Sequence, residues 1–168
     1  MDLEELRRQM PEIFEQVKQD VEREIRRHRA GLSLGLIEMG IYRGNFIAGL
    51  FFAGGTMILM NTTPLRIITA EQPDIVVWSY VYHVLLHEYL HSLGFINEKQ
   101  CRTLTIEISK NVFKDVKHPA VIFATKGLGA FFPKLHLIYA PTNFSLQKGV
   151  RIEKIKEFDK SSYQSYFI

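Results

Sequence analysis

Three histidines stand four residues apart in the stretch HVLLHEYLHSLGFINEKQ (83–100), and Glu88 directly follows the middle one, His87. In an α-helix, residues i and i+4 lie one turn apart on the same face. The imidazoles of His87 and His91 can therefore share one tetrahedral Zn²⁺, at about 2.0–2.1 Å each. Glu88 is offset by one position, so its carboxylate lies beside the metal, where it can accept a proton from a water molecule. This is the chemistry of the pattern H-E-x-x-H on a helix.

The helix that carries this pattern is expected to be buried. Residues 75–93 (IVVWSYVYHVLLHEYLHSL) are apolar on nearly every side, and Gly94 is typical of a C-terminal cap. Two imidazoles and an ionised carboxylate in such a helix lose several kcal/mol of free energy if nothing pairs with them. A metal ion satisfies all three polar groups together. The sequence therefore favours a metal centre over a helix of packed core histidines.

The third metal ligand is predicted to be Glu98. It opens a second helix, about 98–113, that Asn97 can cap and that runs back along the first after the turn at Gly94. A first-turn glutamate there can face a metal held near the last turns of the preceding helix.

Two alternatives for the third ligand remain open, Glu107 or a more distal residue, and His83. Each four-residue step along a helix rotates the side chain by about 40°, so His83 lies about 80° from His91. Three histidines along one straight helix surround a tetrahedral metal poorly. His83 is better explained as a residue beside the site or on the substrate side.

The rest of the chain predicts an α+β fold. Apolar residues recur at steps of three and four over residues 2–29, which indicates an amphipathic helix that Pro11 can kink or split. Strand-like segments are expected at 31–40, 46–52, 56–60 and 148–158.

Three other segments are less regular. Residues 41–45 are typical of a turn, and residues 61–74 of a polar, turn-rich connection. Residues 119–125 fit either a helix or a strand.

Length, charge and cysteine content narrow the class of protein. A chain of 168 residues suits one domain, expected over residues 1–160, with a short tail at 161–168. The net charge of +3 is mild and dispersed, which argues against a nucleic-acid partner. One cysteine, Cys101, excludes an internal disulfide, and the N-terminus has no apolar core like that of a signal peptide, so a cytoplasmic location is expected.

One uncharged stretch resembles a membrane segment only superficially. Residues 46–60 (FIAGLFFAGGTMILM) span 15 positions, whereas a helix that crosses a bilayer needs about 20. Glycines interrupt the stretch at positions 49, 54 and 55. We expect two buried strands around a glycine turn and no membrane partner.

The sequence resembles the zincin metallopeptidases, and more narrowly the gluzincins, whose third ligand is a glutamate on the helix after the motif helix. HEYLH (87–91) and NEKQCRTL (97–104) are similar to small gluzincins such as the ImmA/IrrE-type peptidases and the minigluzincins. In those proteins the ligand glutamate precedes a small residue by three positions, as Glu98 precedes Cys101. Asn97 stands where the metzincins carry a third histidine. GGTMILMN (54–61) resembles the edge strand that such peptidases run antiparallel to bound substrate.

The resemblance, which covers about residues 30–113, implies a minimal zincin-like fold. The expected parts of this fold are a small mixed sheet with an antiparallel edge strand, the buried HExxH helix and the glutamate-bearing helix, together with the N-terminal helix, which the resemblance does not cover. It also implies a zinc-dependent peptidase in which Glu88 is the general base for a metal-activated water. Zn²⁺ is then the cofactor, held by His87, His91 and Glu98, and a peptide or unfolded protein is the substrate, added along the sheet edge.

Four questions stay open from the sequence. Enzymes of this class stabilise the oxyanion with a tyrosine or histidine, for which His118, His136 and Tyr139 are candidates. An alternative function is a catalytically weak zinc-binding domain of the same fold with a regulatory or peptide-binding role. The tail, SSYQSYFI, either lies in the cleft and restrains activity or is a simple surface end. The oligomeric state is not indicated.

Overall fold

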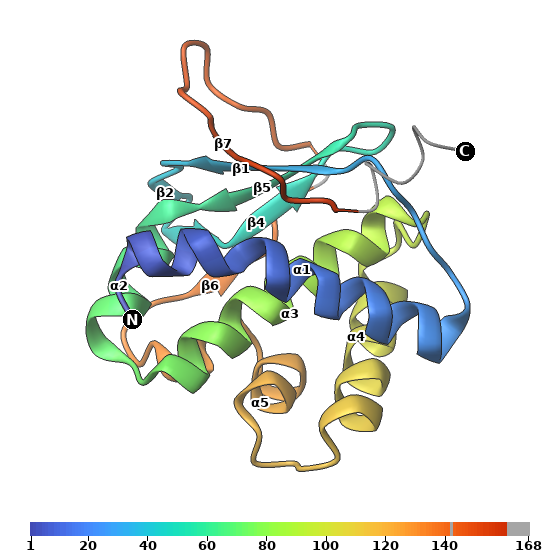
Figure 1. Cartoon of the computed structure of the whole chain (residues 1–168). Coiled ribbons are helices and arrows are strands. Elements are labelled where there is room, and N and C mark those ends of the chain that lie inside the picture. Colours follow the sequence, from blue (N-terminus) through green and yellow to red (C-terminus); the bar gives the residue numbers. More distant parts are fainter. Residues whose placement is uncertain (142, 161–168) are drawn as a thin grey trace.

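Helix α3 (Asp74–Ser92) runs through the middle of the molecule and carries the three histidines (Figure 1). A computed structural model describes residues 1–141 and 143–160 of the chain. The described residues form five α-helices and two small mixed sheets, so the expected α+β class is confirmed. The expected helix over 75–93 is confirmed as α3, and it is buried on nearly all sides, with Tyr80, Tyr82 and Tyr89 fully enclosed.

Helix α1 (Leu3–Ile25) packs across α3 in front of the sheet (Figure 1). The side chain of Asp2 caps it by accepting from the amide of Glu5 at 2.8 Å. Pro11 lies inside α1 without dividing it into two helices. The helix ends at Ile25, earlier than expected, because Arg26 takes the left-handed conformation (φ 58°) and its N–H donates to the carbonyl of Glu22.

The larger sheet has the strand order β4-β5-β1-β7. Its strands are β1 (Ser33–Ile37), β4 (Gly49–Phe51), β5 (Met57–Asn61) and β7 (Glu153–Ile155). β5 runs parallel to β1 and antiparallel to β4. The expectation that residues 54–61 form the edge strand is wrong, because β5 pairs on both sides. The edge nearest α3 is β4 instead, and it is antiparallel to its neighbour.

The smaller sheet joins β2 (Ile41–Tyr42), β3 (Asn45–Ile47) and β6 (Leu137–Ile138). The expected turn at 41–45 is a tight β2–β3 hairpin. The expected single strand over 46–52 is divided at Ala48 between the two sheets. The Ala48 amide donates to the carbonyl of Ile138 at 3.0 Å, while its carbonyl accepts from the amide of Asn61 at 3.0 Å. This backbone link brings β6, far along the sequence, beside the strands near α3.

The expectation of a turn-rich connection at 61–74 is wrong, because most of it forms helix α2 (Thr62–Glu71). The side chain of Asn61 caps this helix by accepting from the amide of Thr63 at 3.1 Å. Pro64 falls in the first turn, where its missing N–H costs no intrahelical hydrogen bond. Leu65 and Ile68 are fully buried and hold α2 to the core.

Two further helices pack against α3. α4 (Glu98–Phe113) has the predicted bounds, with Asn97 accepting from the amide of Gln100 at 3.0 Å. Residues 119–125, which fitted helix or strand, form helix α5 (Pro119–Lys126), followed by a 3-10 turn at Leu128–Phe131. Both helices lie below the sheet in Figure 1, and both contact α3.

The two faces of the larger sheet are covered differently. Helices α1 and α3 cover one face (Figure 1). Side chains from the segment after β6 cover a small apolar cluster on the other face, made of Ile37, Leu50 and Leu59. Phe144 and Leu146 are among these covering side chains. The chain therefore passes from β6 across the outside of the sheet before it returns as β7.

The long uncharged stretch at 46–60 forms strands, as expected, but it is divided among β3, β4 and β5 where two strands were predicted. In the part of the chain that the structure describes, no helix has both the length and the apolar character that a bilayer crossing requires. The tail at 161–168 lies outside the described residues, so its placement in the cleft stays a prediction.

Candidate metal centre

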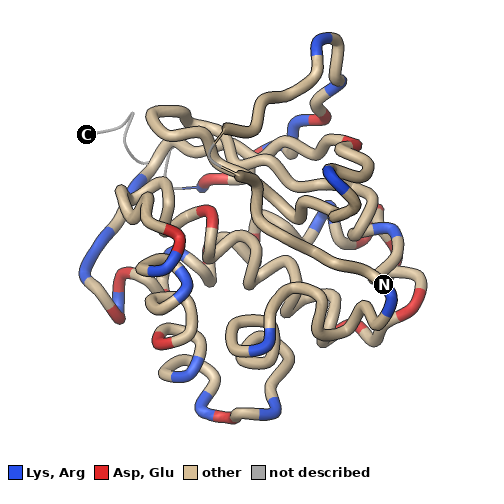
Figure 2. The backbone as a smooth tube through the Cα atoms, turned by 180° about the vertical axis from the view of Figure 1, so that it is seen from behind, with Lys and Arg blue, Asp and Glu red and all other residues tan. Residues whose placement is uncertain are grey.

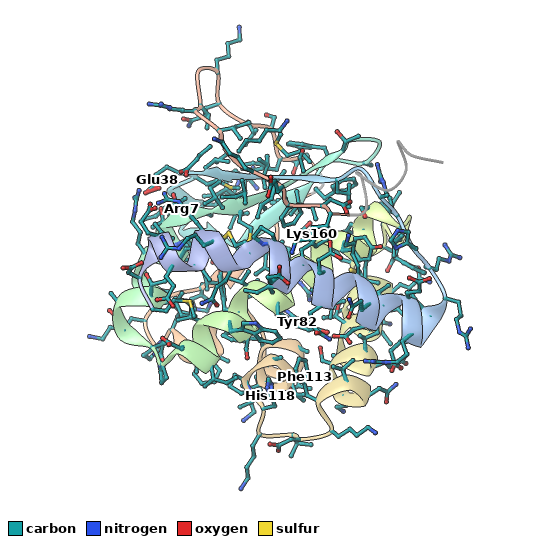
Figure 3. The ribbon with its side chains drawn as sticks, viewed as in Figure 1. Arg7, Glu38, Tyr82, Phe113, His118 and Lys160 are labelled. Carbon is teal, nitrogen blue, oxygen red and sulfur yellow. The ribbon has the colours of Figure 1, made fainter. Side chains whose placement is uncertain are left out.

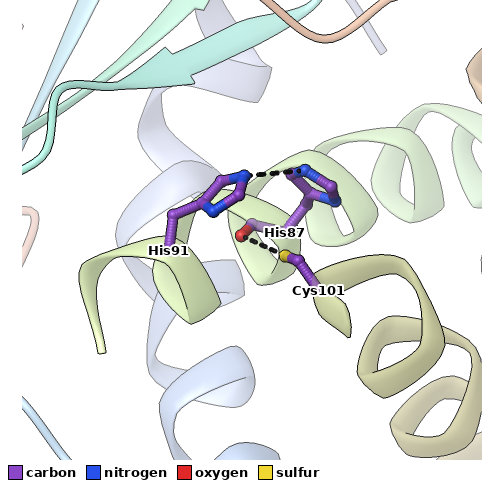
Figure 4. Close-up of side chains that lie close together, drawn as sticks. All are labelled: His87, His91 and Cys101. Carbon is purple, nitrogen blue, oxygen red and sulfur yellow. Dashed lines mark hydrogen bonds between the residues drawn. The ribbon is translucent and has the colours of Figure 1, made fainter. Parts of the chain in front are cut away.

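Three side-chain donor groups from α3 and α4 converge on one point. His87 Nε2 lies 3.1 Å from His91 Nε2, a contact drawn in Figure 4. The carboxylate of Glu98 completes the set, with Oε1 at 2.7 Å from His91 Nε2 and Oε2 at 3.3 Å from His87 Nε2. Ligand atoms held at about 2.0–2.1 Å around a tetrahedral zinc lie about 3.3 Å from one another. The donor set therefore fits a zinc ion in both chemistry and spacing.

The turn between the two helices orients His91. Gly94 takes φ 104°, a conformation that side-chain-bearing residues rarely adopt, and so lets the chain reverse after α3. The reversal brings the carbonyl oxygen of Phe95 to 2.8 Å from His91 Nδ1. With its proton on Nδ1 and donated to this carbonyl, His91 presents the lone pair of Nε2 to the convergence point.

Burial and charge set the protonation of the donors. Burial lowers the pKa of His87 against the attraction of Glu98, so His87 is in the neutral form that binds metals. Burial opposes ionisation of Glu98, but hydrogen bonds to both histidines hold its pKa well below the usual range. Burial also works against the charged form of His91, yet its contact with Glu98 raises its pKa overall. A metal ion bound by the two imidazoles would replace the proton of His91 as the positive charge beside Glu98.

Glu88 is buried on the same side of α3, with 2% of its surface exposed. Burial raises its pKa to about 8, against the attraction of His91. Strand β4 passes close above it. A Cβ placed on Gly49 would lie 2.8 Å from Val84 Cγ1 and 3.6 Å from Glu88 Cγ. The absence of a side chain at position 49 allows the sheet edge to approach the helix at Glu88.

A pocket of about 190 Å³ opens over these groups, and we refer to it as the metal-side pocket. Glu88, His91 and Glu98 line it, with residues 49–53 on one side and the chain at Tyr139 on the other. Most of its other lining is apolar. Phe52 and Ile96 also line it and are 41% and 60% exposed, respectively.

Tyr139 is the one proposed oxyanion residue that the structure brings to this site. Its ring stacks on His87, with centroids 3.5 Å apart and planes 7° apart, and its Oη lies 2.6 Å from His83 Nε2. His118 caps α5 instead and stacks on Phe113, away from the sheet (Figure 3). His136 is exposed before β6 and does not line the pocket.

The other proposed third ligands lie elsewhere. His83 is buried behind Tyr139, to which it is hydrogen-bonded. Glu107 is exposed, more than two turns after Glu98 on α4. Glu98 is therefore the proposed ligand that the structure places against both histidines.

Cys101 was not predicted as a candidate ligand, but it also lies beside the pair. Its ligand atom and those of His87 and His91 lie within 4.8 Å of one another, so this group can hold a metal ion. Its Sγ donates to the carbonyl of His87 at 3.4 Å (Figure 4), and burial raises the pKa of its thiol. A bound metal ion would deprotonate this thiol, so Cys101 is an alternative to Glu98 as the third ligand. The sequence carries one signal of this closeness between α4 and α3: the residue three positions after Glu98, Cys101, is small.

No family model matches the sequence, and the chain matches no curated protein and no solved structure. What the site does is therefore argued from its own geometry.

Proposed function

We propose that this chain is a zinc-dependent metallopeptidase. The observation that carries the proposal is the convergence of three donor groups at 2.7–3.3 Å, with Glu88 in a pocket that His91 and Glu98 also line. Metal-binding histidines alone do not need a buried carboxyl beside them. A carboxyl group that acts as the general base must lie in that position, beside the metal ligands.

The proposed ligands are His87 Nε2, His91 Nε2 and the carboxylate of Glu98. Catalytic zinc sites have three protein ligands and keep the fourth position open, whereas structural sites are closed by four. A bound zinc supplies Lewis acidity and lowers the pKa of a coordinated water to about 7.

The remaining residues bind, orient and move protons. Glu88 accepts a proton from the attacking water and later gives it to the leaving amine nitrogen. Tyr139 lines the metal-side pocket and is the candidate donor to the carbonyl oxygen of the substrate, a role for which its hydroxyl must leave His83 Nε2, which lies 2.6 Å away in this structure.

The edge of β4 suits an extended peptide as the substrate. β4 ends the sheet beside the metal-side pocket and pairs only with β5 among the described strands. A peptide can add to such an edge through main-chain hydrogen bonds. Figure 2 shows acidic and basic residues interspersed along the backbone, which fits a peptide or unfolded protein better than a nucleic acid.

One observation favours the alternative, a catalytically weak zinc-binding domain. The metal-side pocket of about 190 Å³, which Tyr139 and Phe144 help to line, is smaller than the roughly 300–1,000 Å³ of typical ligand sites. A productive peptidase must widen this pocket when substrate binds. A regulatory domain needs no such movement.

Metal analysis with a proteolysis assay separates these functions. We expect about one zinc per chain by elemental analysis, hydrolysis of an unfolded protein substrate, loss of hydrolysis with a chelator and recovery with added zinc. Zinc without hydrolysis would support the alternative. A purified protein that neither contains nor binds zinc would exclude both.

A further inference from the structure

A second pocket of about 350 Å³ lies on the other side of Tyr139. It is enclosed by α3, α4, α5 and β6, and we refer to it as the basic pocket. His83, His87 and Arg102 contribute to its lining, and Tyr139 lines both pockets. The basic pocket is thus separated from the metal-side pocket by one aromatic ring that rests on a proposed metal ligand.

The two pockets carry opposite charges. Glu88 and Glu98 line the metal-side pocket, to which no lysine or arginine contributes among the described residues. Arg102 and Lys126 line the basic pocket, where the described part of the chain contributes no aspartate or glutamate. The basic pocket is therefore suited to an anionic group and the metal-side pocket is not.

A buried histidine in the basic pocket lacks a hydrogen-bond partner. His83 is 3% exposed, and its Nδ1 has no partner among the described residues, although its Nε2 is bonded to Tyr139. Buried polar side-chain atoms are almost always paired, and leaving one unpaired costs about 1–3 kcal/mol. An oxygen atom of a ligand in this pocket would satisfy Nδ1.

Arg102 connects the basic pocket to the metal centre. Its guanidinium carbon lies 5.8 Å from the centroid of the Tyr139 ring, and its Nε lies 3.9 Å from Glu98 Oε2. An extended peptide advances about 3.3–3.6 Å per residue. A carboxylate bound by Arg102 would therefore lie within one or two residues of a peptide bond at the metal centre, once the Tyr139 ring between the two pockets moves off His87 to let the substrate pass.

We propose that the basic pocket binds the free C-terminal carboxylate of a peptide, so that the protein cleaves close to the C-terminus of its substrates. The inference rests on the proposed peptidase function and names the substrate end that this function selects. Arg102 and Lys126 supply the positive charge, and His83 Nδ1 supplies a neutral hydrogen-bond partner at the wall of the pocket. A terminal carboxylate is the anion that every linear peptide carries, whereas an acidic side chain occurs only in some.

The test uses three synthetic five-residue peptides of apolar sequence. One has a free C-terminal carboxylate, one has a C-terminal amide, and one is the amide with glutamate as its last residue. Binding is measured by titration calorimetry on the zinc-loaded Glu88→Gln protein, in which turnover is blocked. We expect the free acid to bind about tenfold more tightly than either amide, a difference of about 1.4 kcal/mol.

Substitutions then assign this preference to the basic pocket. Arg102→Gln combined with Lys126→Gln should bring the ratio of acid to amide affinity to within about twofold, with zinc content measured because Arg102 is near Glu98. Lys110→Gln removes an exposed charge elsewhere on α4 and should keep the preference.

Equal affinities for acid and amide, or a preference that survives the double substitution, would overturn the inference while leaving the peptidase proposal intact. Equally tight binding of the glutamate amide would assign the pocket to an acidic side chain and overturn the C-terminal assignment. Binding of none of the peptides, together with no hydrolysis by the unsubstituted protein, would refute the proposed function and the inference with it.

Discussion

The imidazole of His91 is held by the backbone of Phe95, whose carbonyl oxygen lies 2.8 Å from Nδ1. This contact exists because Gly94 reverses the chain directly after α3 with φ 104°. The same turn starts α4 with Glu98 in its first position. One short turn therefore orients one proposed ligand, His91, and places another, Glu98, beside it. The metal centre is thus built largely from the local geometry of the 12 residues from His87 to Glu98.

Glu98→Ala should weaken zinc binding by more than about 100-fold, because it removes the carboxylate that, among the described residues, contacts both histidines. Affinity is measured by competition with a chromophoric chelator. Glu107→Ala is the matched control, since it removes an exposed glutamate from the same helix, and it should bind zinc like the unsubstituted chain. If Glu98→Ala kept its affinity while Cys101→Ala lost it, the thiol would be the third ligand.

Much of the site was predictable from the sequence because its parts are close together along the chain. The long apolar run at residues 75–93, the glycine after it and the Asn97 cap are local signals, and they correctly predicted two helices and the neighbourhood of Glu98. Tyr139 is different. It reaches His87 only because β6 pairs with β3, and no local pattern near position 139 indicates that pairing.

Two of the errors in the predicted fold also come from pairing between strands that are far apart in the sequence. The strand at 57–61 was expected at the sheet edge, but its position depends on β1 and β4 pairing with it from both sides. The division of the chain at Ala48 between two sheets also depends on a distant partner, Ile138. Helix α2 was missed because threonine and proline suggest a turn, and they are equally suited to a first helical turn behind an Asn cap.

Gly49→Ala should destabilise the fold by about 1–3 kcal/mol, because its Cβ would lie 2.8 Å from Val84 Cγ1 and 3.0 Å from the carbonyl oxygen of Leu59. Urea unfolding followed by circular dichroism gives the free energy of unfolding. Thr56→Ala changes an exposed residue just before β5 and should stay within about 0.5 kcal/mol. A Gly49→Ala protein as stable as this control would show that β4 does not press on α3.

Lys18→Met should lower the free energy of unfolding by about 3–5 kcal/mol. Lys18 Nζ lies 2.6 Å from Asp159 Oδ1, and the two side chains are 3% and 1% exposed, so the substitution takes the lysine from a buried carboxylate. Lys160→Met breaks a solvent-exposed pair with Glu12 and should have a much smaller effect on the free energy of unfolding. The same urea titration measures both, and equal effects would mean that the Lys18–Asp159 pair does not anchor the chain after β7.

Stability should fall as the pH rises above about 10, the pKa of an exposed tyrosine. Burial raises the pKa of Tyr89 to about 12 and raises those of Tyr80 and Tyr82 further. Below pH 10 these groups are neutral in both states, so their contribution is intact. Above it, the unfolded chain loses protons that the folded chain keeps, which favours unfolding by about 1.4 kcal/mol per such tyrosine at pH 11.

Tyr80→Phe isolates this effect, because the Tyr80 hydroxyl has no hydrogen-bond partner among the described residues. The variant should match the unsubstituted protein or exceed its stability at pH 8, and it should lose less stability between pH 9 and pH 11 by about 1.4 kcal/mol. Urea titrations at these pH values provide the comparison. An identical pH dependence in the two proteins would place the Tyr80 ring in contact with water.

The central claim is that Glu88 is the general base of a zinc peptidase, and Glu88→Gln tests it most directly. Glutamine keeps the shape of the side chain in its buried position but cannot accept a proton from water. The measurement is the rate of hydrolysis of an unfolded protein by the unsubstituted and Glu88→Gln proteins, each with its zinc content determined. The account predicts about one zinc per chain in both and a loss of at least about 100-fold in rate in the variant. Equal rates in the two proteins, or no hydrolysis by the zinc-loaded unsubstituted chain, would contradict it.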